Sequence, residues 1–169
     1  MSEFLLWPTE VTRAWWRTYR PGDPAGEGDP DLPVAVNYQE AIEFCEWISG
    51  RYGVKARLPT AEEWMVAASS GTPGVKYPWG WGLPEGRAAF GGTSAQVVAS
   101  FPAAPNGLYD MAGNVAEWAL AAEGEDRAPV MGGSWAERDP DYLRIAHRLS
   151  LPRSYRGADV GFRMLIELP

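Results

Sequence analysis

The chain has very little that could cross-link it or hold a transition metal. Its 169 residues include one cysteine, Cys45, and one histidine, His147. A single cysteine cannot form an internal disulfide, so packing or a metal ion must hold the fold together. Cys45 falls on the apolar side of an expected helix, where a buried structural thiol is the plain interpretation. A single histidine cannot supply the two-histidine, one-carboxylate set that binds non-haem iron.

The chain also lacks long apolar runs and an excess of positive charge. No apolar run approaches the roughly 20 residues of a membrane span, and residues 1–3 lack the basic side chains that open a signal peptide. We therefore expect a soluble protein, cytoplasmic by default, with no membrane insertion. The formal net charge of −7 argues against nucleic acid as a partner, because phosphate binding needs a basic surface. Lysine is scarce beside arginine, a bias that is typical of thermostable proteins.

Glycine, proline and tryptophan are abundant instead. Nineteen Gly, fifteen Pro and nine Trp indicate many turns and bulky aromatic packing rather than long regular elements. The length fits one domain over residues 1–169. We expect a loop-rich fold, with 21–33 as a surface loop and 71–107 as an irregular stretch held in place by its aromatic residues.

Helix signals lie in the first half of the chain. An Asn or Thr placed three residues before a Glu forms a capping box at Asn37 and again at Thr60, and apolar residues then recur at helical spacing. These patterns predict two helices, the first ending by Gly53 and the second by Gly71. A shorter helix after Thr12 would place several aromatic rings on one face.

Strand-like runs bounded by turn residues follow in the second half. They lie at residues 115–118, 129–131, 142–145 and 160–164. Helices followed by strands predict an α+β domain, in which two helices pack on short antiparallel sheets.

Six motifs in order connect these elements to a known family. They are Glu10-Val-Thr12, Arg57-Leu-Pro-Thr-Ala-Glu-Glu-Trp64, Tyr77-Pro-Trp-Gly80, Gly107-Leu-Tyr-Asp-Met-Ala-Gly-Asn-Val-Ala-Glu-Trp118, Gly132-Gly-Ser-Trp135 and Gly161-Phe-Arg163. Together they resemble the formylglycine-generating enzyme, or sulfatase-modifying factor, family. The resemblance implies a C-type-lectin-like (formylglycine-generating-enzyme-like) fold from about Glu10 to Met164.

Residues 110–118 combine two carboxylates and an amide with a glycine that frees the backbone to present carbonyls, and such oxygen donors suit calcium. The family resemblance implies one structural Ca²⁺, held by the side chains of Asp110 and Glu117 and the carbonyls of Gly113 and Val115. The alternative is that Asp110 caps a turn and Glu117 pairs with an arginine. A second calcium site, found in some relatives, is not expected, because Ala88, Ala89 and Phe90 offer no side-chain oxygen there.

The cysteines of the oxygen-dependent, copper-binding relatives have no counterpart. The resemblance places those cysteines shortly after the Gly-Gly-Ser-aromatic motif, where this chain has Glu137 and Tyr142. Neither side chain is a thiolate ligand for copper. The lone histidine lacks the nucleophile signature that a serine triad would need. We therefore expect no formylglycine synthesis, no copper, no iron and no catalytic residue.

The 135–159 segment instead has the composition of a binding surface. It mixes aromatic and arginine side chains with small residues, which is typical of interaction hot spots, although an ordinary solvated surface is the alternative. A second resemblance sharpens this hypothesis. Variable proteins of diversity-generating retroelements use the same fold, and their diversified stretch lies between the Gly-Gly-Ser-Trp and Gly-Phe-Arg motifs. From residue 144 to residue 159 there is no Lys, Gln, Glu, Met or Trp, which are the types that mutation of adenines in Asn codons does not produce.

The second resemblance implies a ligand- or protein-binding display module, compatible with display by a phage or a host. Trp135, Gly161 and Phe162 would be fixed scaffold. The alternative is a non-diversified sulfatase-modifying-factor-family protein, acting as a non-haem metal enzyme or an accessory domain. The candidate variable, ligand-contacting positions are Ala136, Glu137, Asp139, Tyr142, Arg144, His147, Leu149, Ser150, Arg153, Tyr155, Gly157 and Ala158.

Overall fold

In the computed structural model, which describes residues 3–169, side-chain caps fix where the α-helices begin. The Asn37 side chain accepts a hydrogen bond from the Glu40 N–H at 3.0 Å, and the Glu40 carboxylate accepts one from the Asn37 N–H at 2.8 Å. The same reciprocal pair joins Thr60 and Glu63, and the Thr12 hydroxyl caps the first helix. All three predicted helices are therefore confirmed. They are α1 (Arg13–Tyr19), α2 (Tyr38–Tyr52) and α3 (Ala61–Ala68).

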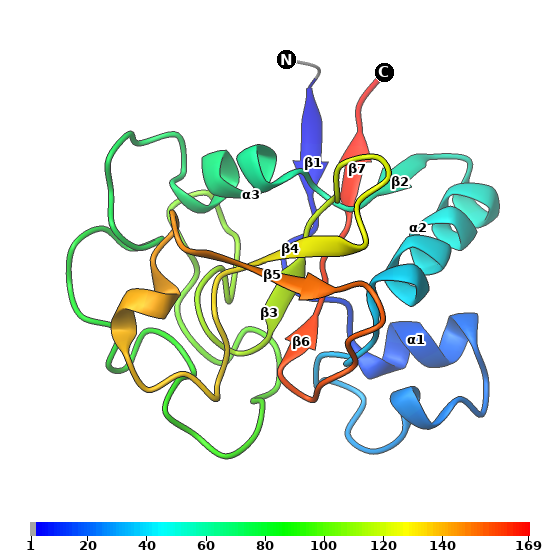
Figure 1. Cartoon of the computed structure of the whole chain (residues 1–169), viewed down its shortest axis with the longest axis horizontal. Helices are drawn as coiled ribbons and strands as arrows, with labels where there is room; N and C mark the ends of the chain where they lie inside the picture. The colour runs from blue at the N-terminus through cyan, green and yellow to red at the C-terminus, as the bar shows by residue number, and fades with distance from the viewer. Residues whose placement is uncertain (1–2) are drawn as a thin grey trace.

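The first sheet joins the two ends of the chain. Its strand order is β1-β7-β2 and both pairings are antiparallel, with Ile166 of β7 opposite Leu5 of β1 and Ala56 of β2. The first and the last strand of the chain therefore lie side by side at one end of the molecule (Figure 1). The strands are β1 (Phe4–Leu6), β2 (Lys55–Arg57) and β7 (Leu165–Glu167).

The second sheet lies wholly in the C-terminal half, in the order β5-β4-β3-β6. The chain leaves β5 at one edge and crosses to the opposite edge before it enters β6, so β6 runs parallel to β3 while the other pairings are antiparallel. The prediction of purely antiparallel sheets was wrong at this one pairing. The strands are β3 (Ala116–Trp118), β4 (Arg127–Met131), β5 (Arg148–Pro152) and β6 (Val160–Gly161).

The strand predicted at residues 142–145 was also wrong. This stretch overlaps a 3-10 turn, η2 (Pro140–Leu143), because the Asp139 side chain accepts a hydrogen bond from the Asp141 N–H at 2.9 Å and the proline starts the turn. Leu143 and Ile145 are buried, so their alternation reflects core packing of an irregular segment. The strand that was missed, β5, begins three residues later.

Only the first two residues of the run predicted as one strand over 160–164 form a strand. β6 ends at Gly161, and the chain then passes through fully buried Phe162 and Arg163 before β7 begins. Residues 162–164 are buried but lie outside both sheets, which periodicity alone does not reveal.

Aromatic rings fill the core between the helices and the sheets. Phe44 of α2 stacks on Trp16 of α1 with their centroids 5.8 Å apart and meets Phe162 edge-on at 5.4 Å. None of these three side chains has exposed surface. On the other side of the molecule, Trp64 of α3 is buried in a cluster with Met131 of β4, so α3 packs against the second sheet.

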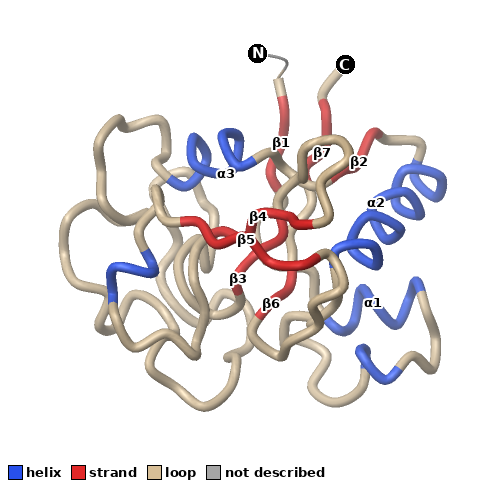
Figure 2. The backbone as a smooth tube through the Cα atoms, viewed as in Figure 1, coloured by secondary structure: helices blue, strands red, loops and turns tan. Residues whose placement is uncertain are grey.

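Loops make up much of the chain, as the tan segments of Figure 2 show. The long irregular stretch 71–107 is held by Tyr77, which has no exposed surface and whose hydroxyl donates to the Pro140 carbonyl at 3.1 Å. Trp79 stacks on Tyr77, whereas Trp81 is 72% exposed. A second 3-10 turn, η1 (Pro24–Gly26), lies in the surface loop 21–33. No helix within residues 3–169 has the length and the apolar character required to cross a membrane.

Candidate functional site

Two buried motifs form a rigid frame around the 135–159 segment. At one end, Gly132, Gly133 and Ser134 are buried, and a Cβ on Gly133 would lie 2.7 Å from the Tyr142 carbonyl oxygen. At the other end, a Cβ on Gly161 would lie 2.6 Å from the Val34 carbonyl oxygen. Both glycines are required because backbone approaches backbone closely at these points.

Trp135 connects the two ends of this frame. Its indole N–H donates to the Ala158 carbonyl at 3.3 Å, so the start and the end of the 135–159 segment are tied together. Gly161 and Phe162 are buried, as expected for scaffold positions, while Trp135 is only half-buried and shows part of its ring at the surface. Trp135 therefore belongs both to the frame and to the surface that the frame presents.

None of the twelve candidate contact positions is buried. Five are half-buried and the others are exposed. Leu143 and Ile145, which interrupt this series, are buried and face the core. The half-buried positions are Glu137, His147, Arg153, Tyr155 and Gly157, and the exposed ones are Ala136, Asp139, Tyr142, Arg144, Leu149, Ser150 and Ala158.

Five side chains of the segment interact through a ring contact, through charge and through a hydrogen bond. The Tyr142 and His147 rings meet edge-on with their centroids 4.9 Å apart. Glu137 follows, and its pKa is raised by burial and by the charge of Asp159, against the opposing effect of His147. The Tyr155 hydroxyl donates to the Asp159 carboxylate at 3.1 Å and closes the line. We call these five residues the polar line.

Other candidate positions are held by neighbours outside the segment. The Arg153 guanidinium donates to the Ala122 carbonyl at 3.2 Å and lies 4.9 Å above the Tyr38 ring. Ser150 accepts hydrogen bonds from the Arg127 side chain at both its hydroxyl and its carbonyl. These contacts orient the side chains at the edge of the sheet and leave Leu149, which is 40% exposed, uncovered beside them.

Gly157 is less free than its place in the predicted variable set implies. A Cβ on this residue would lie 2.4 Å from both the Tyr155 hydroxyl and the Asp159 carboxylate. Any larger side chain must therefore move the end of the polar line. Gly157 supports the surface by making room for its neighbours.

Sequence reasoning missed Asp159 as a member of the site. Asp159 was expected only to end the segment, yet it bonds Tyr155 and raises the pKa of Glu137. No sequence signal pairs these residues, because the loop between them has no regular spacing. Arg138 and Arg148, which are exposed in the same segment, were also left out of the predicted set.

The predicted calcium ligands lie in a separate buried network of charges. Glu117 is 1% exposed and its carboxylate accepts two hydrogen bonds of 2.7 Å from Arg163 and one of 2.7 Å from the Trp64 indole. Arg163 has no exposed surface and also donates to the carbonyls of Trp7, Pro8 and Tyr109. Arg163 binds Glu117 in bidentate fashion, and it is therefore the arginine that the sequence predicts as the alternative to a metal ion.

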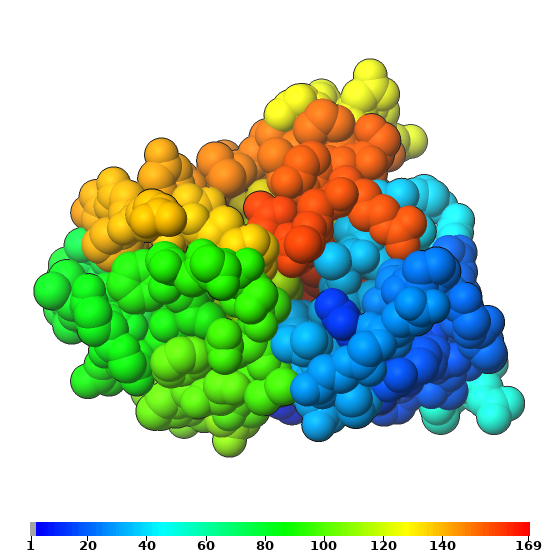
Figure 3. All heavy atoms as spheres, turned by 90° about the horizontal axis from the view of Figure 1, so that it is seen from below, coloured from blue at the N-terminus to red at the C-terminus, as the bar shows by residue number. Residues whose placement is uncertain are grey.

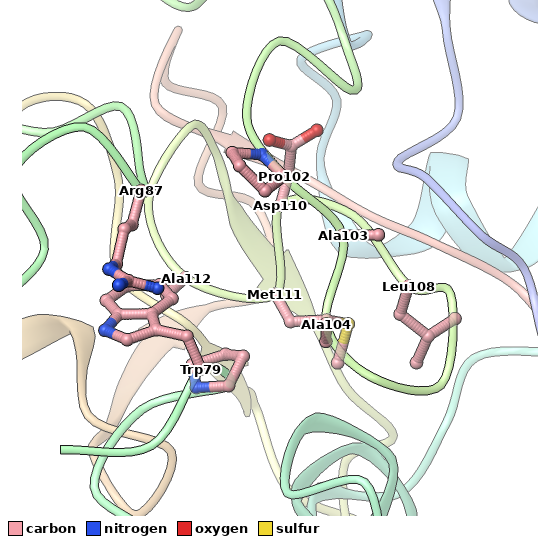
Figure 4. A pocket seen from close by; sticks show the side chains of 10 residues that line it. Trp79, Arg87, Pro102, Ala103, Ala104, Leu108, Asp110, Met111 and Ala112 are labelled. Carbon is pink, nitrogen blue, oxygen red and sulfur yellow. The ribbon is translucent and has the colours of Figure 1, made fainter. Parts of the chain in front are cut away.

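Asp110 is anchored elsewhere in the same network. Its backbone has φ of 54° and its carboxylate accepts a hydrogen bond from the Ala99 N–H at 2.7 Å, so it holds a turn of the neighbouring loop. In the pocket of Figure 4, the Asp110 carboxylate points away from Trp79 and Arg87. Burial is the main cause that raises its pKa.

Glu10 adds a third carboxylate to this network. One oxygen accepts from the Asn114 side-chain amide at 2.9 Å, and the other is buried without a hydrogen-bond partner. Its pKa is raised well above the ordinary value by burial and then by Asp110. Within residues 3–169, no three His, Cys, Asp or Glu side chains are arranged to hold a metal ion. Glu117 is paired with Arg163 and Asp110 is bonded to the loop, so both predicted side-chain ligands already have protein partners. Occupancy by calcium stays a prediction.

The one cysteine of the chain lies far from reactive surroundings. Cys45 is 2% exposed on the core side of α2, and burial raises its pKa to about 12. A thiol with so high a pKa is a poor nucleophile at neutral pH. Its predicted burial is confirmed.

Comparison with known proteins identifies the family. The model of the sulfatase-modifying factor enzyme 1-like domain matches residues 4–168. The protein named inactive C-alpha-formylglycine-generating enzyme 2 of Bos taurus is 36% identical over 186 residues, which cover 94% of this chain and 58% of that protein. Serine/threonine-protein kinase pkn1 of Chlamydia pneumoniae is 37% identical over 134 residues, which cover 68% of this chain and 20% of the kinase. The chain thus spans less than two thirds of the length of either relative.

A solved structure agrees with this result. Treponema denticola variable protein 1 superposes with a TM-score of 0.84 at 26% identity, over 98% of this chain and 84% of that one. The resemblance read from the six motifs, including that to variable proteins, is confirmed. Since the family model and the bovine relative each cover nearly the whole chain, the chain belongs to the sulfatase-modifying factor enzyme 1-like family and has its C-type-lectin-like fold.

Proposed function

We propose that this domain is a binding module whose 135–159 segment contacts a protein or another surface ligand, and that the side chains of this segment are diversified by a retroelement. The observation that carries the proposal is the separation of accessible positions from a rigid frame. All twelve candidate positions have accessible surface, while Gly133, Gly161 and Phe162 around them are buried. Substitutions at exposed sites usually change stability by only about 0.5 kcal/mol, so such a surface can vary while the fold persists.

The arrangement of the segment supports a single contact surface. The orange to red-orange atoms of this part of the chain form a continuous band along one side of the molecule in Figure 3. Within the band, Tyr142 and Tyr155 supply partly exposed aromatic rings, and Arg138 and Arg148 supply exposed guanidinium groups. Tyr and Arg are the residue types that most often anchor protein interfaces.

The likeness to a protein named variable protein 1 supports the diversification part of the proposal. Its decisive test is the DNA that flanks the gene. Sequencing the neighbourhood should reveal a reverse transcriptase gene and a template repeat that matches the codons for residues 135–159 except at adenines. A neighbourhood that contains neither element overturns diversification.

Binding is tested separately with a library. Ala136, Tyr142, Leu149 and Ala158 are randomised, and the domain is selected against a panel of unrelated proteins. A matched library randomises four exposed positions outside the segment: Glu62, Val66, Leu83 and Glu85. Specific binders should come from the first library alone, and equal yields from both would contradict the proposal.

An oxygen-dependent enzymatic role is tested by measuring the metal content and the oxygen consumption of the purified domain. Positions 137 and 142 hold a carboxylate and a phenol, and Cys45 has no second thiol to join it. The purified domain should therefore contain no stoichiometric copper or iron and should consume no oxygen with thiol peptides. Finding either metal together with oxygen consumption would overturn the assignment as a binding module.

A further inference from the structure

A separate apolar recess lies between the ends of α1 and α2 and the β1-β7-β2 sheet, and it shares no residue with the 135–159 segment. Its volume is about 230 Å³, it is lined by aliphatic and aromatic side chains, and no polar atom contributes to its surface. Ile48 and Met164, which are 3% and 2% exposed, form its floor. Three aromatic rings, those of Trp7, Trp15 and Tyr52, form its walls.

The three rings are set at steep angles to one another. Trp7 and Trp15 are 6.0 Å apart between centroids with an interplanar angle of 88°, and Trp15 and Tyr52 are 6.5 Å apart at 73°. Rings arranged in this way line one volume from different directions. The face of an aromatic ring carries negative charge density and attracts cations. A recess lined by three such rings can therefore attract a cation as well as an apolar group.

The faces of these three rings are not paired with a cation of the part of the domain that the structure describes. Within residues 3–169, no Lys or Arg lies over Trp7, Trp15 or Tyr52, and Tyr52 is 53% exposed. Four other rings are each covered by a side chain of the domain. The covering cations are Arg20 over Trp16 and Tyr19, Lys76 over Tyr77 and Arg153 over Tyr38.

We propose that this recess binds the methylated quaternary ammonium group of a small molecule. An ammonium group with N–H donors would lose its hydrogen bonds to water there, because no polar atom lines the recess. A quaternary ammonium group has no N–H to satisfy. Its methyl groups pack on the aliphatic floor while its charge meets the ring faces, and the net charge of −7 on the chain favours a cationic ligand.

The test compares two ligands of the same shape. Choline is titrated against 3,3-dimethylbutan-1-ol, in which a carbon replaces the charged nitrogen, and binding is followed on the indole N–H signals of Trp7 and Trp15 by NMR. Choline should bind at least about tenfold more tightly than the neutral alcohol, since cation–π attraction is lost in the alcohol. Equal affinities, or no shift of these signals with either ligand, would overturn the proposal.

A pair of exposed aromatic substitutions locates the site. Tyr52→Leu should weaken choline binding several-fold and leave the affinity for the neutral alcohol nearly unchanged. Trp81→Leu is the matched control, because Trp81 is 72% exposed and does not line the recess. Both side chains are mostly solvent-exposed, so both variants should fold. An unchanged choline affinity in Tyr52→Leu, or an equal loss in Trp81→Leu, would place the binding elsewhere and overturn the assignment.

Discussion

The domain holds two groups of ionisable side chains that use carboxylates in opposite ways. Glu10, Asp110, Glu117 and Arg163 form a network in which Glu10, Glu117 and Arg163 are at most 1% exposed. Glu137, His147 and Asp159 form part of the polar line, where every member retains accessible surface. In the first group Glu117 and Arg163 are each fixed by several partners, whereas in the second group most contacts can be lost without leaving a buried charge. Burial, and not residue type, therefore separates the framework from the accessible surface.

The largest effect should come from removing the buried cation. Arg163→Leu leaves the Glu117 carboxylate buried and unpaired, which costs about 3–5 kcal/mol of the free energy of unfolding. Urea denaturation measures this loss. The control is Arg144→Leu, which removes an exposed arginine paired with Asp141 and should cost no more than about 1 kcal/mol. Equal losses in the two variants would erase the distinction between the two groups.

A smaller effect should come from the glycine frame. In Gly133→Ala the new Cβ would lie only 2.7 Å from the Tyr142 carbonyl oxygen, at a residue whose φ is 65°. The backbone must therefore shift, and we expect the free energy of unfolding to fall by roughly 2–3 kcal/mol. Gly124→Ala tests strain without crowding, because φ is 78° and no atom lies within 4 Å of its Cβ. That control should lose about 1–2 kcal/mol. Thermal unfolding of both variants compares them, and a control loss as large as that of Gly133→Ala would refute the crowding argument.

The pH dependence of stability tests the unpaired oxygen of Glu10. Because its pKa is raised in the folded state, folding binds a proton, and stability falls as pH rises from the unfolded value near 4.5 through the folded one. Glu10→Gln removes this group and should flatten the fall between pH 5 and pH 8. Urea denaturation at both pH values, with EDTA and with calcium, checks the result. Stabilisation of the wild type by calcium at pH 8 would show that a metal ion, and not a proton, offsets the charge.

The smallest effect is expected at the accessible surface. Ala136→Ser, Leu149→Ser and Ala158→Ser together change three exposed positions of the 135–159 segment. Their combined effect should stay below about 1.5 kcal/mol, since each exposed substitution contributes about 0.5 kcal/mol or less. Thermal unfolding of the triple variant measures it. A larger loss would mean that this segment is framework, like the buried network.

Local chemistry made part of the fold readable from the sequence. The capping boxes at Asn37 and Thr60 act within four residues, so the helix starts were predicted correctly. The six motifs gave the family for the same reason, since each is a short, continuous run. The prediction of a strand at residues 142–145 was wrong because Leu143 and Ile145 are buried in the core, while Asp139 and Pro140 form a turn.

The site was readable only in part. The extent of the accessible segment followed from its position between two motifs, and the absence of a cysteine pair followed from the residues at 137 and 142. The sequence left Glu117 with two possible partners, a calcium ion or an arginine, and gave no reason to choose Arg163, which lies 46 residues away. The constraint on Gly157 was also hidden, because it depends on where Tyr155 and Asp159 meet.

The sequence by itself thus determined the family, the helix starts, the lack of a disulfide and the placement of a mixed polar and aromatic segment between two glycine-containing motifs. Tertiary structure alone decided that Arg163 neutralises Glu117, that the polar line runs from Tyr142 to Tyr155 and that three aromatic rings from separate elements enclose one recess. The reason is physical. Caps and turns depend on neighbours within a few residues, whereas ion pairs, clashes and recesses depend on the distances between segments that only packing brings together.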